Sequence, residues 1–241
     1  MGGIIGPAIG VASVALIGAR LTFLIGAIAG FGSFLLLSGV KEAAHVAKEN
    51  HEPLLTEIKE GIRTVREMPW VGALILMASF QLMVVVASEN VLLPIITKRE
   101  FDTNTVMAMA TTSFAIGGTV ASILSLKLKT KTPGRFTLLT WSLFALVPFS
   151  LAYQESKVII VIAYILAGIS VGPWDAFWPS AIQREVPKDK QGRVFALDHA
   201  GSVGLMPLGM ALTGPTVSLM GEKPFLIFAG IFHLVVNVIV Y

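Results

Sequence analysis

Apolar residues of this chain gather in eight long runs, and most polar residues occupy the gaps between them. A hydrocarbon core about 30 Å thick needs about 20 helical residues to cross it, and each run is near that length or longer. The pattern therefore predicts an all-α fold, a polytopic transmembrane bundle with about eight spans. The predicted spans are 2–19, 21–40, 70–96, 105–126, 136–153, 158–177, 196–220 and 224–241.

The gaps divide the chain into three predicted parts. Residues 1–40 form a two-span hairpin, because Arg20 is the only polar residue where the first two runs meet. Residues 41–69 form a polar linker, and in it Ile58, Ile62 and Val65 have the spacing of an amphipathic helix over 57–68. A solvated linker with fraying helicity is the alternative for this stretch. Residues 70–241 form a six-span bundle that begins after Pro69.

Composition narrows the class of protein. Charged residues are 14% of the chain, against about 25% in ordinary soluble domains, and 54% of the residues are hydrophobic. Without cysteine, the chain has no disulfide, thiolate chemistry or cysteine metal site. Its net charge of +3 comes from short clusters at span ends, which argues against a nucleic-acid partner. The expected partner is the lipid bilayer.

The basic residues predict an orientation. Of the 18 Lys and Arg residues, 13 lie in the linker and in the gaps around 127–135 and 183–195, and 5 lie in the alternate gaps. Because positive charge marks the cytoplasmic side, the linker is predicted to be cytoplasmic. An even number of spans then places both termini in the cytoplasm, in a multi-pass protein of the inner or plasma membrane.

A motif at the start of the chain carries a family resemblance. Gly2, Gly6 and Gly10 place small residues on one helix face, and Pro7 bends that helix. The pattern resembles the G-x-x-x-G-P-x-x-G-G motif in the fifth helix of antiporter-type members of the major facilitator superfamily. Val11 departs from the last glycine of that motif. Another small-residue pair, Gly26-x-x-x-Gly30, predicts close packing of the second span.

A second region extends the resemblance to the branch that exports macrolides and enterobactin. It comprises 183–186, the stretch 187–194 that begins with Pro187 and contains Gly192-Arg193, and the Gly/Pro-rich positions 201–215. The resemblance implies that the eight runs correspond to helices five to twelve of a twelve-span protein. The superfamily's basic loop motif should recur near Gly134-Arg135, but its acidic residue is absent there. The basic residues of that gap are therefore expected to serve only as topology anchors.

Ionisable and polar residues within the apolar runs are candidates for a coupling or substrate site, because charge in hydrocarbon is costly. Glu89 is expected near the outer end of its span, where it either binds a proton or cation or extends to the membrane interface. Asp175 lies between Trp174 and Trp178, which favours substrate binding or, alternatively, an aromatic belt at the interface. Gln81 lies eight residues before Glu89 and is either a substrate contact or an interhelical hydrogen-bond partner.

Three residues form a predicted cytoplasmic gate. Asp198, expected in the first turn of its helix, either complements the helix dipole or pairs with Arg193 or Arg135. His199 adjoins the same interface, and His233, inside the last run, is expected to be a packed neutral histidine.

The chain shows no catalytic, cofactor or metal motif, and no Walker-type loop for ATP. Together with the resemblance, this predicts a secondary active transporter, not an enzyme, that exports an amphipathic small molecule by ion-coupled alternating access, and protons are a candidate for the coupling ion. The alternative is a non-transporting fragment, or an assembly or binding subunit that requires a partner chain. A second chain supplying the missing helices is a further expected partner.

Overall fold

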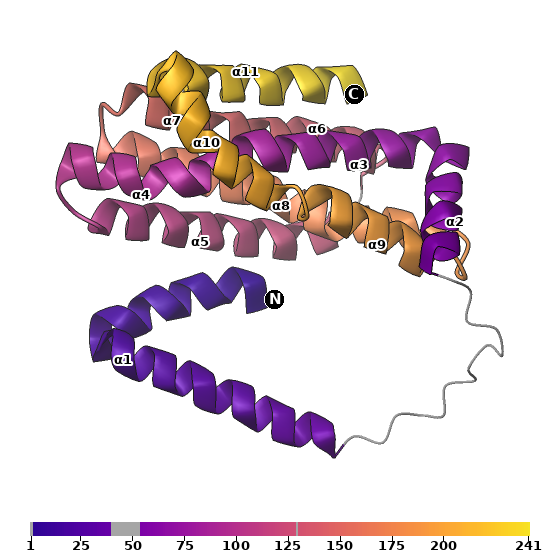
Figure 1. Cartoon of the computed structure of the whole chain (residues 1–241), viewed down its shortest axis with the longest axis horizontal. Helices are drawn as coiled ribbons and strands as arrows, with labels where there is room; N and C mark the ends of the chain where they lie inside the picture. The colour runs from indigo at the N-terminus through magenta and orange to yellow at the C-terminus, as the bar shows by residue number, and fades with distance from the viewer. Residues whose placement is uncertain (1, 40–53, 129) are drawn as a thin grey trace.

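The structure, a computed structural model, describes residues 2–39, 54–128 and 130–241, with side chains for all of them except 2–12, 15, 54 and 55. These residues form helices and loops without a strand (Figure 1). Seven helical segments among them are long and apolar enough to cross a membrane. They are Leu16–Ser38, Pro69–Phe101, Thr105–Lys127, Pro133–Tyr153, Lys157–Glu185, Gln191–Met220 and Glu222–Val240. The predicted all-α polytopic bundle is confirmed.

The predicted first run is the first arm of helix α1 (Gly2–Ser38). This arm is not among the seven candidate spans, and most of its side chains lie outside the described set. The helix breaks at Gly18, whose φ of 80° and ψ of 159° are easy only for glycine. The hinge is thus at Gly18 and not at Arg20, because glycine supplies the conformation and arginine does not. Figure 1 shows the two arms as a V.

The second arm of α1 is open to its surroundings. No residue of its most apolar 18-residue window is buried. A Cβ added at Gly26 or Gly30 would have no described atom within 4 Å, apart from those of its chain neighbours and of the backbone of its own helix. The close packing predicted for this glycine pair is therefore absent from the structure.

Helix α2 (Leu54–Glu67) is the helix predicted within the linker, and it ends just before Pro69 opens α3 (Pro69–Gln81). It lies across the bundle where α3 begins (Figure 1). Its contact with α9 (Gln191–Ser202) is made through Gly61, where an added Cβ would press on Leu197. Ile58 and Ile62 stay 41% and 39% exposed, so the described helices cover only part of the apolar face of α2.

Two of the spans are interrupted by other helix types. A π-helical segment, η1 (Leu82–Val86), joins α3 to α4 (Ala87–Phe101). A 3-10 segment, η2 (Ser142–Ala145), joins α6 (Pro133–Trp141) to α7 (Leu146–Tyr153). The remaining helices are α5 (Thr105–Lys127), α8 (Lys157–Glu185), α10 (Met206–Met220) and α11 (Glu222–Val240).

The crossing of α5 and α8 holds the bundle together. Gly168 and Gly172 of α8 lie so close to α5 that an added Cβ would clash with the backbone at Phe114 and Ala121, respectively. Gly117 of α5 lies equally close to the carbonyl of Ile165. Glycine therefore permits a backbone contact that no other residue allows. This Gly168-x-x-x-Gly172 pair was not among the predicted packing motifs.

The bundle has two ends, which are named here by their residues. The Arg99 end is where α4 ends and α11 begins, and the Trp70 end is where α3 begins and α8 ends. Both ends can be followed in Figure 1, at the left and right of the bundle respectively.

Candidate substrate and coupling site

A buried carboxylate lies at the wall of a partly open cavity. Glu89 of α4 is 8% exposed, and its Oε1 accepts a hydrogen bond of 2.5 Å from the hydroxyl of Tyr164 of α8. Both residues line a cavity of about 290 Å³ whose other walls come from α5, η2 and α7. Asn90 and Thr111 add polar groups, and the remaining lining residues are Val86, Phe114, Ala115, Gly118, Phe144, Val147 and Val171. The site thus offers one acid in a mainly apolar, aromatic chamber.

The π segment shapes the backbone that carries Glu89. In η1 the backbone N–H of Ala87 donates to the carbonyl of Leu82, five residues back. Ser88 Oγ donates to the carbonyls of Val84 and Val85, at 2.7 and 2.8 Å. Such single π turns are often found at functional sites. The segment therefore places a local irregularity one turn before the acid.

The structure corrects the expected position of Glu89. Its helix continues for 12 residues beyond it, to Phe101, so Glu89 lies well inside the span and not near its outer end. The side chain is buried and bonded to Tyr164, which excludes the alternative in which it extends to the interface. Tyr164 was not among the predicted site residues, although a phenol hydroxyl within an apolar run was an available signal.

Gln81 is fully buried and joins three helices by hydrogen bonds. Its Oε1 accepts from Trp141 Nε1 at 2.7 Å, and its Nε2 donates to the His233 carbonyl and to Asn237 Oδ1, each at 3.1 Å. Its partners lie on α6 and α11, whereas Glu89 bonds to α8. The structure therefore favours the interhelical role of Gln81 and does not bring it into the Glu89 cavity.

His233 is buried beside this network. Its Nε2 lies 2.8 Å from the carbonyl of Trp141, and its Nδ1 is buried without a partner among the described atoms. Its ring packs against Trp141 and Phe144, with centroids 5.4 and 5.8 Å apart. These contacts are those of the packed histidine that its place in the last run predicts.

Trp174 belongs to a cluster that contains all four tryptophans of the chain. Its ring centroid lies 5.8 Å from that of Trp178 and 5.7 Å from that of Trp141. Trp70 meets Trp178 edge-on at 6.2 Å. Trp174 and Trp178 thus pack against other tryptophans, and both also line the hollow that Asp175 borders.

Asp175 lies on the exposed side of α8. It borders a hollow of about 400 Å³ beside α5, together with Ser122, whose Oγ is buried without a partner among the described atoms. The Glu89 cavity does not include Asp175. The two acids proposed for coupling therefore belong to different surfaces.

The three predicted gate residues have other partners. Asp198 Oδ2 accepts a hydrogen bond of 2.8 Å from Trp178 Nε1. Arg193 pairs with Glu60 of α2, and the guanidinium of Arg135 lies 5.6 Å from the ring centroid of Tyr241. Helix α9 begins at Gln191, so Asp198 is two turns into its helix and not in the first turn. These contacts do not include a bond between Asp198 and either arginine, so the cytoplasmic gate remains a prediction.

The glycine–proline motif at Gly2, Gly6, Pro7 and Gly10 is helical in the backbone of α1. Its side-chain packing lies outside the described residues. Among the residues that are described, no group of three or more His, Cys, Asp or Glu side chains could hold a metal ion.

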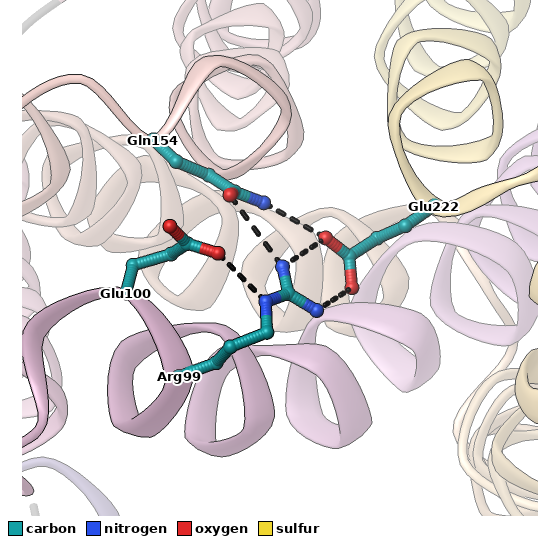
Figure 2. Close-up of polar contacts among 4 residues, drawn as sticks. All are labelled: Arg99, Glu100, Gln154 and Glu222. Atoms are coloured by element: carbon teal, nitrogen blue, oxygen red, sulfur yellow. Dashed lines mark hydrogen bonds and ion pairs between the residues drawn. The ribbon is translucent and has the colours of Figure 1, made fainter.

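A polar network closes the Arg99 end (Figure 2). Arg99 donates two hydrogen bonds to Glu222, Nη1 to Oε2 at 3.0 Å and Nη2 to Oε1 at 2.7 Å. Gln154 Nε2 donates to the same carboxylate at 2.8 Å, and Glu100 accepts from Arg99 Nε at 2.6 Å. The network ties α4, the end of α7 and the start of α11. No local pattern in the sequence indicates it, because Gln154 and Glu222 lie 55 and 123 residues from Arg99.

Comparison with known proteins gives two results. The family described as the Major Facilitator Superfamily matches residues 1–202. Two proteins named "Multidrug efflux pump Tap", from Mycobacterium tuberculosis (strain ATCC 25618 / H37Rv) and Mycobacterium bovis (strain BCG / Pasteur 1173P2), are each 26% identical to the chain over 224 residues. That alignment covers 90% of this chain and 53% of each relative, so the chain spans about half the length of these relatives. No solved structure matches significantly.

Proposed function

Because this chain belongs to the major facilitator superfamily, we propose that it acts in a secondary active transporter that exports amphipathic small molecules by alternating access. Membership places it among membrane transporters and not among enzymes, and its spans make it a multi-pass cell-membrane protein. The direction and substrate class in the proposal follow the relatives' description as multidrug efflux pumps.

The observation that carries the proposal is the pairing of Glu89 with Tyr164 at the wall of the cavity of about 290 Å³. A carboxyl group inside a membrane bundle is costly and is retained where it binds an ion, a proton or a substrate. Aromatic and aliphatic walls suit the apolar part of an amphipathic molecule, and one acid suits a proton or a cationic group.

The proposed mechanism couples the charge of Glu89 to substrate binding. With Glu89 ionised, the Tyr164 hydroxyl donates to the carboxylate and the cavity attracts a cationic group. A proton bound at Glu89 removes that charge and weakens the attraction, so the substrate leaves. Exchange of proton for substrate then follows from competition for one carboxylate.

The chain spans about half the length of its relatives, so the proposed transport requires further helices. Alternating access requires two bundles that rock about a shared site. We propose that helices beyond those of this chain, supplied by a second chain, face the bundle described above. The predicted cytoplasmic position of both termini belongs to the same proposal.

Uptake into inverted membrane vesicles tests the coupling role. Ethidium serves as an amphipathic cationic probe, and its gradient-driven uptake is measured for the wild-type chain and for the variants Glu89→Gln and Asp175→Asn. Glu89→Gln is expected to abolish gradient-driven uptake, because the exchanged proton has no site, and to weaken ethidium exchange without a gradient, because the cation loses its carboxylate. Tyr164→Phe is expected to reduce uptake only in part.

The matched control is Glu67→Gln, because Glu67 is an exposed acid of α2. It should leave uptake unchanged. Undiminished proton-driven uptake by both Glu89→Gln and Asp175→Asn would refute the coupling proposal. Vesicles in which the wild-type chain gives no uptake, even with a partner chain present, would instead support the role of an assembly or binding subunit.

A further inference from the structure

The Trp70 end contains a second cavity, separate from the Glu89 cavity. It has a volume of about 310 Å³ and lies between the start of α3, the start of α6 and the last turns of α8. Its walls include the aromatic residues Trp70, Trp174, Phe177 and Trp178, and Ala181 of α8 also lines it. We call it the tryptophan pocket. It shares no lining residue with the Glu89 cavity.

A hydrogen bond and ring contacts hold Trp174 and Trp178 in place. Trp178 donates its Nε1 hydrogen to Asp198, and Trp141, which supports Trp174 from the bundle interior, donates its own to Gln81. Trp174 and Trp178 are stacked, with an interplanar angle of 24°. Because the indole N–H of Trp178 is bonded to Asp198, this ring presents carbon surface to an occupant, not a hydrogen-bond donor.

The charges at the pocket rim cancel. Arg184 Nε lies 2.8 Å from Glu185 Oε1 at the opening, and the two side chains are 68% and 47% exposed. A ligand would therefore be selected by ring stacking and shape, and not by a net charge at the rim. The volume is at the lower end of the range of about 300–1,000 Å³ for small-molecule pockets.

From this geometry we propose that the tryptophan pocket binds flat, uncharged aromatic compounds of two or three fused rings. The occupant stacks on the indole faces of Trp174 and Trp178, and Trp70 closes one side edge-on. Binding at this site does not depend on transport, and a chain that exports nothing would still bind there.

Acridine, uncharged at alkaline pH, is the probe, and the purified full chain in detergent is the sample. Because all four tryptophans belong to the cluster, their fluorescence reports occupancy directly, and acridine is expected to quench it saturably. Ala181→Phe fills the pocket and retains every tryptophan. It should weaken binding at least about tenfold, because the added ring occupies the ligand volume.

Ala211→Phe is the matched control. It makes the same substitution at an exposed residue of α10 that does not line the tryptophan pocket. It should leave the acridine Kd unchanged. Equal quenching of wild type and Ala181→Phe would overturn the proposal, as would equal loss in both variants, because the signal would then report partition into detergent or damage to the fold.

A measurement on the wild-type chain covers the case in which Ala181→Phe fails to fold. Photolabelling with azidoacridine, followed by peptide mass spectrometry, is expected to mark the pocket segments of α3, α6 and α8. Labels confined to other segments, such as the exposed arm of α1, would overturn the proposal even if quenching is saturable.

Discussion

The two ends of the bundle are built differently. At the Arg99 end, a bidentate ion pair joins α4 to α11, and Gln154 bonds to the same carboxylate. At the Trp70 end, stacked indole rings surround a cavity of about 310 Å³. Directional polar bonds fix the positions of helix ends, whereas aromatic faces tolerate a range of occupants. The comparison teaches that one end is built to stay closed and the other to accept a ligand.

The turns at the Arg99 end support this difference. Asp102, Gln154 and Gly221 have φ values of 48°, 51° and 87°. Each lies where a helix ends or begins, and the first two are non-glycine residues in the left-handed region, which costs free energy unless the surroundings enforce it. Gln154 is held there while its side chain bonds to Glu222. The closed end therefore combines enforced turns with an ion pair.

The largest expected loss of stability comes from a substitution at the crossing of α5 and α8. Gly168→Leu should destabilise the chain by about 3 kcal/mol, because its Cβ would meet the carbonyl of Phe114 and separate α5 from α8. Thermal unfolding in detergent, followed by circular dichroism, measures the loss. Gly26→Leu, at a position with no such neighbour within 4 Å, should change stability by less than about 0.5 kcal/mol. Equal effects of the two substitutions would contradict the role of the crossing.

A smaller loss of stability is expected from replacing Gln81, at the end of α3. Gln81→Leu leaves Trp141 Nε1 without its acceptor, which should cost about 1 to 2 kcal/mol of unfolding free energy. Because Trp141 supports Trp174, acridine binding should weaken as well. Unfolding and quenching titrations are the measurements, and the exposed Gln183→Leu is the control. Unaltered acridine binding would show that the pocket does not depend on the Gln81 network.

The smallest expected effect is the coupling of the ion pair at the Arg99 end. A double-mutant cycle with Arg99→Ala and Glu222→Ala should give a coupling energy of about 1 kcal/mol, reduced at high salt. The equivalent cycle for Arg63 and Glu67, which are 81% and 52% exposed on α2, should give about 0.3 kcal/mol. A coupling as small at Arg99 as at Arg63 would mean that the closed end is not held by this pair.

The sequence predicted the spans well because burial in lipid and helix length act on every residue of a run. The positions 70–96 and 158–177 lie within the observed spans Pro69–Phe101 and Lys157–Glu185. It predicted the hinge near Arg20 within two residues, and it missed that glycine at Gly18 makes the turn.

Contacts between helices were harder to predict. Small-residue pairs are common in membrane helices, and spacing alone did not distinguish Gly26 and Gly30 from Gly168 and Gly172. An added Cβ at the first pair would meet no described atom of another helix within 4 Å, whereas the second pair crosses α5. The bond from Tyr164 to Glu89 joins residues 75 apart, and its existence depends on how α4 and α8 pack. Local patterns hold no information on that packing.

The π segment Leu82–Val86 has a consequence for motion along its span. A π turn holds one more residue than an α turn, so it stores one residue of slack in the helix. If that turn rewound as α-helix, the part of the helix beyond it would rotate by about 100° relative to the part before. Glu89 would then leave Tyr164, while Gln81 kept its bonds to Trp141 and Asn237. Deleting one residue of the segment would remove this slack and leave Glu89 beside Tyr164, whereas rewinding of the undeleted helix would be registered as lost proximity by cysteine cross-linking between positions 89 and 164.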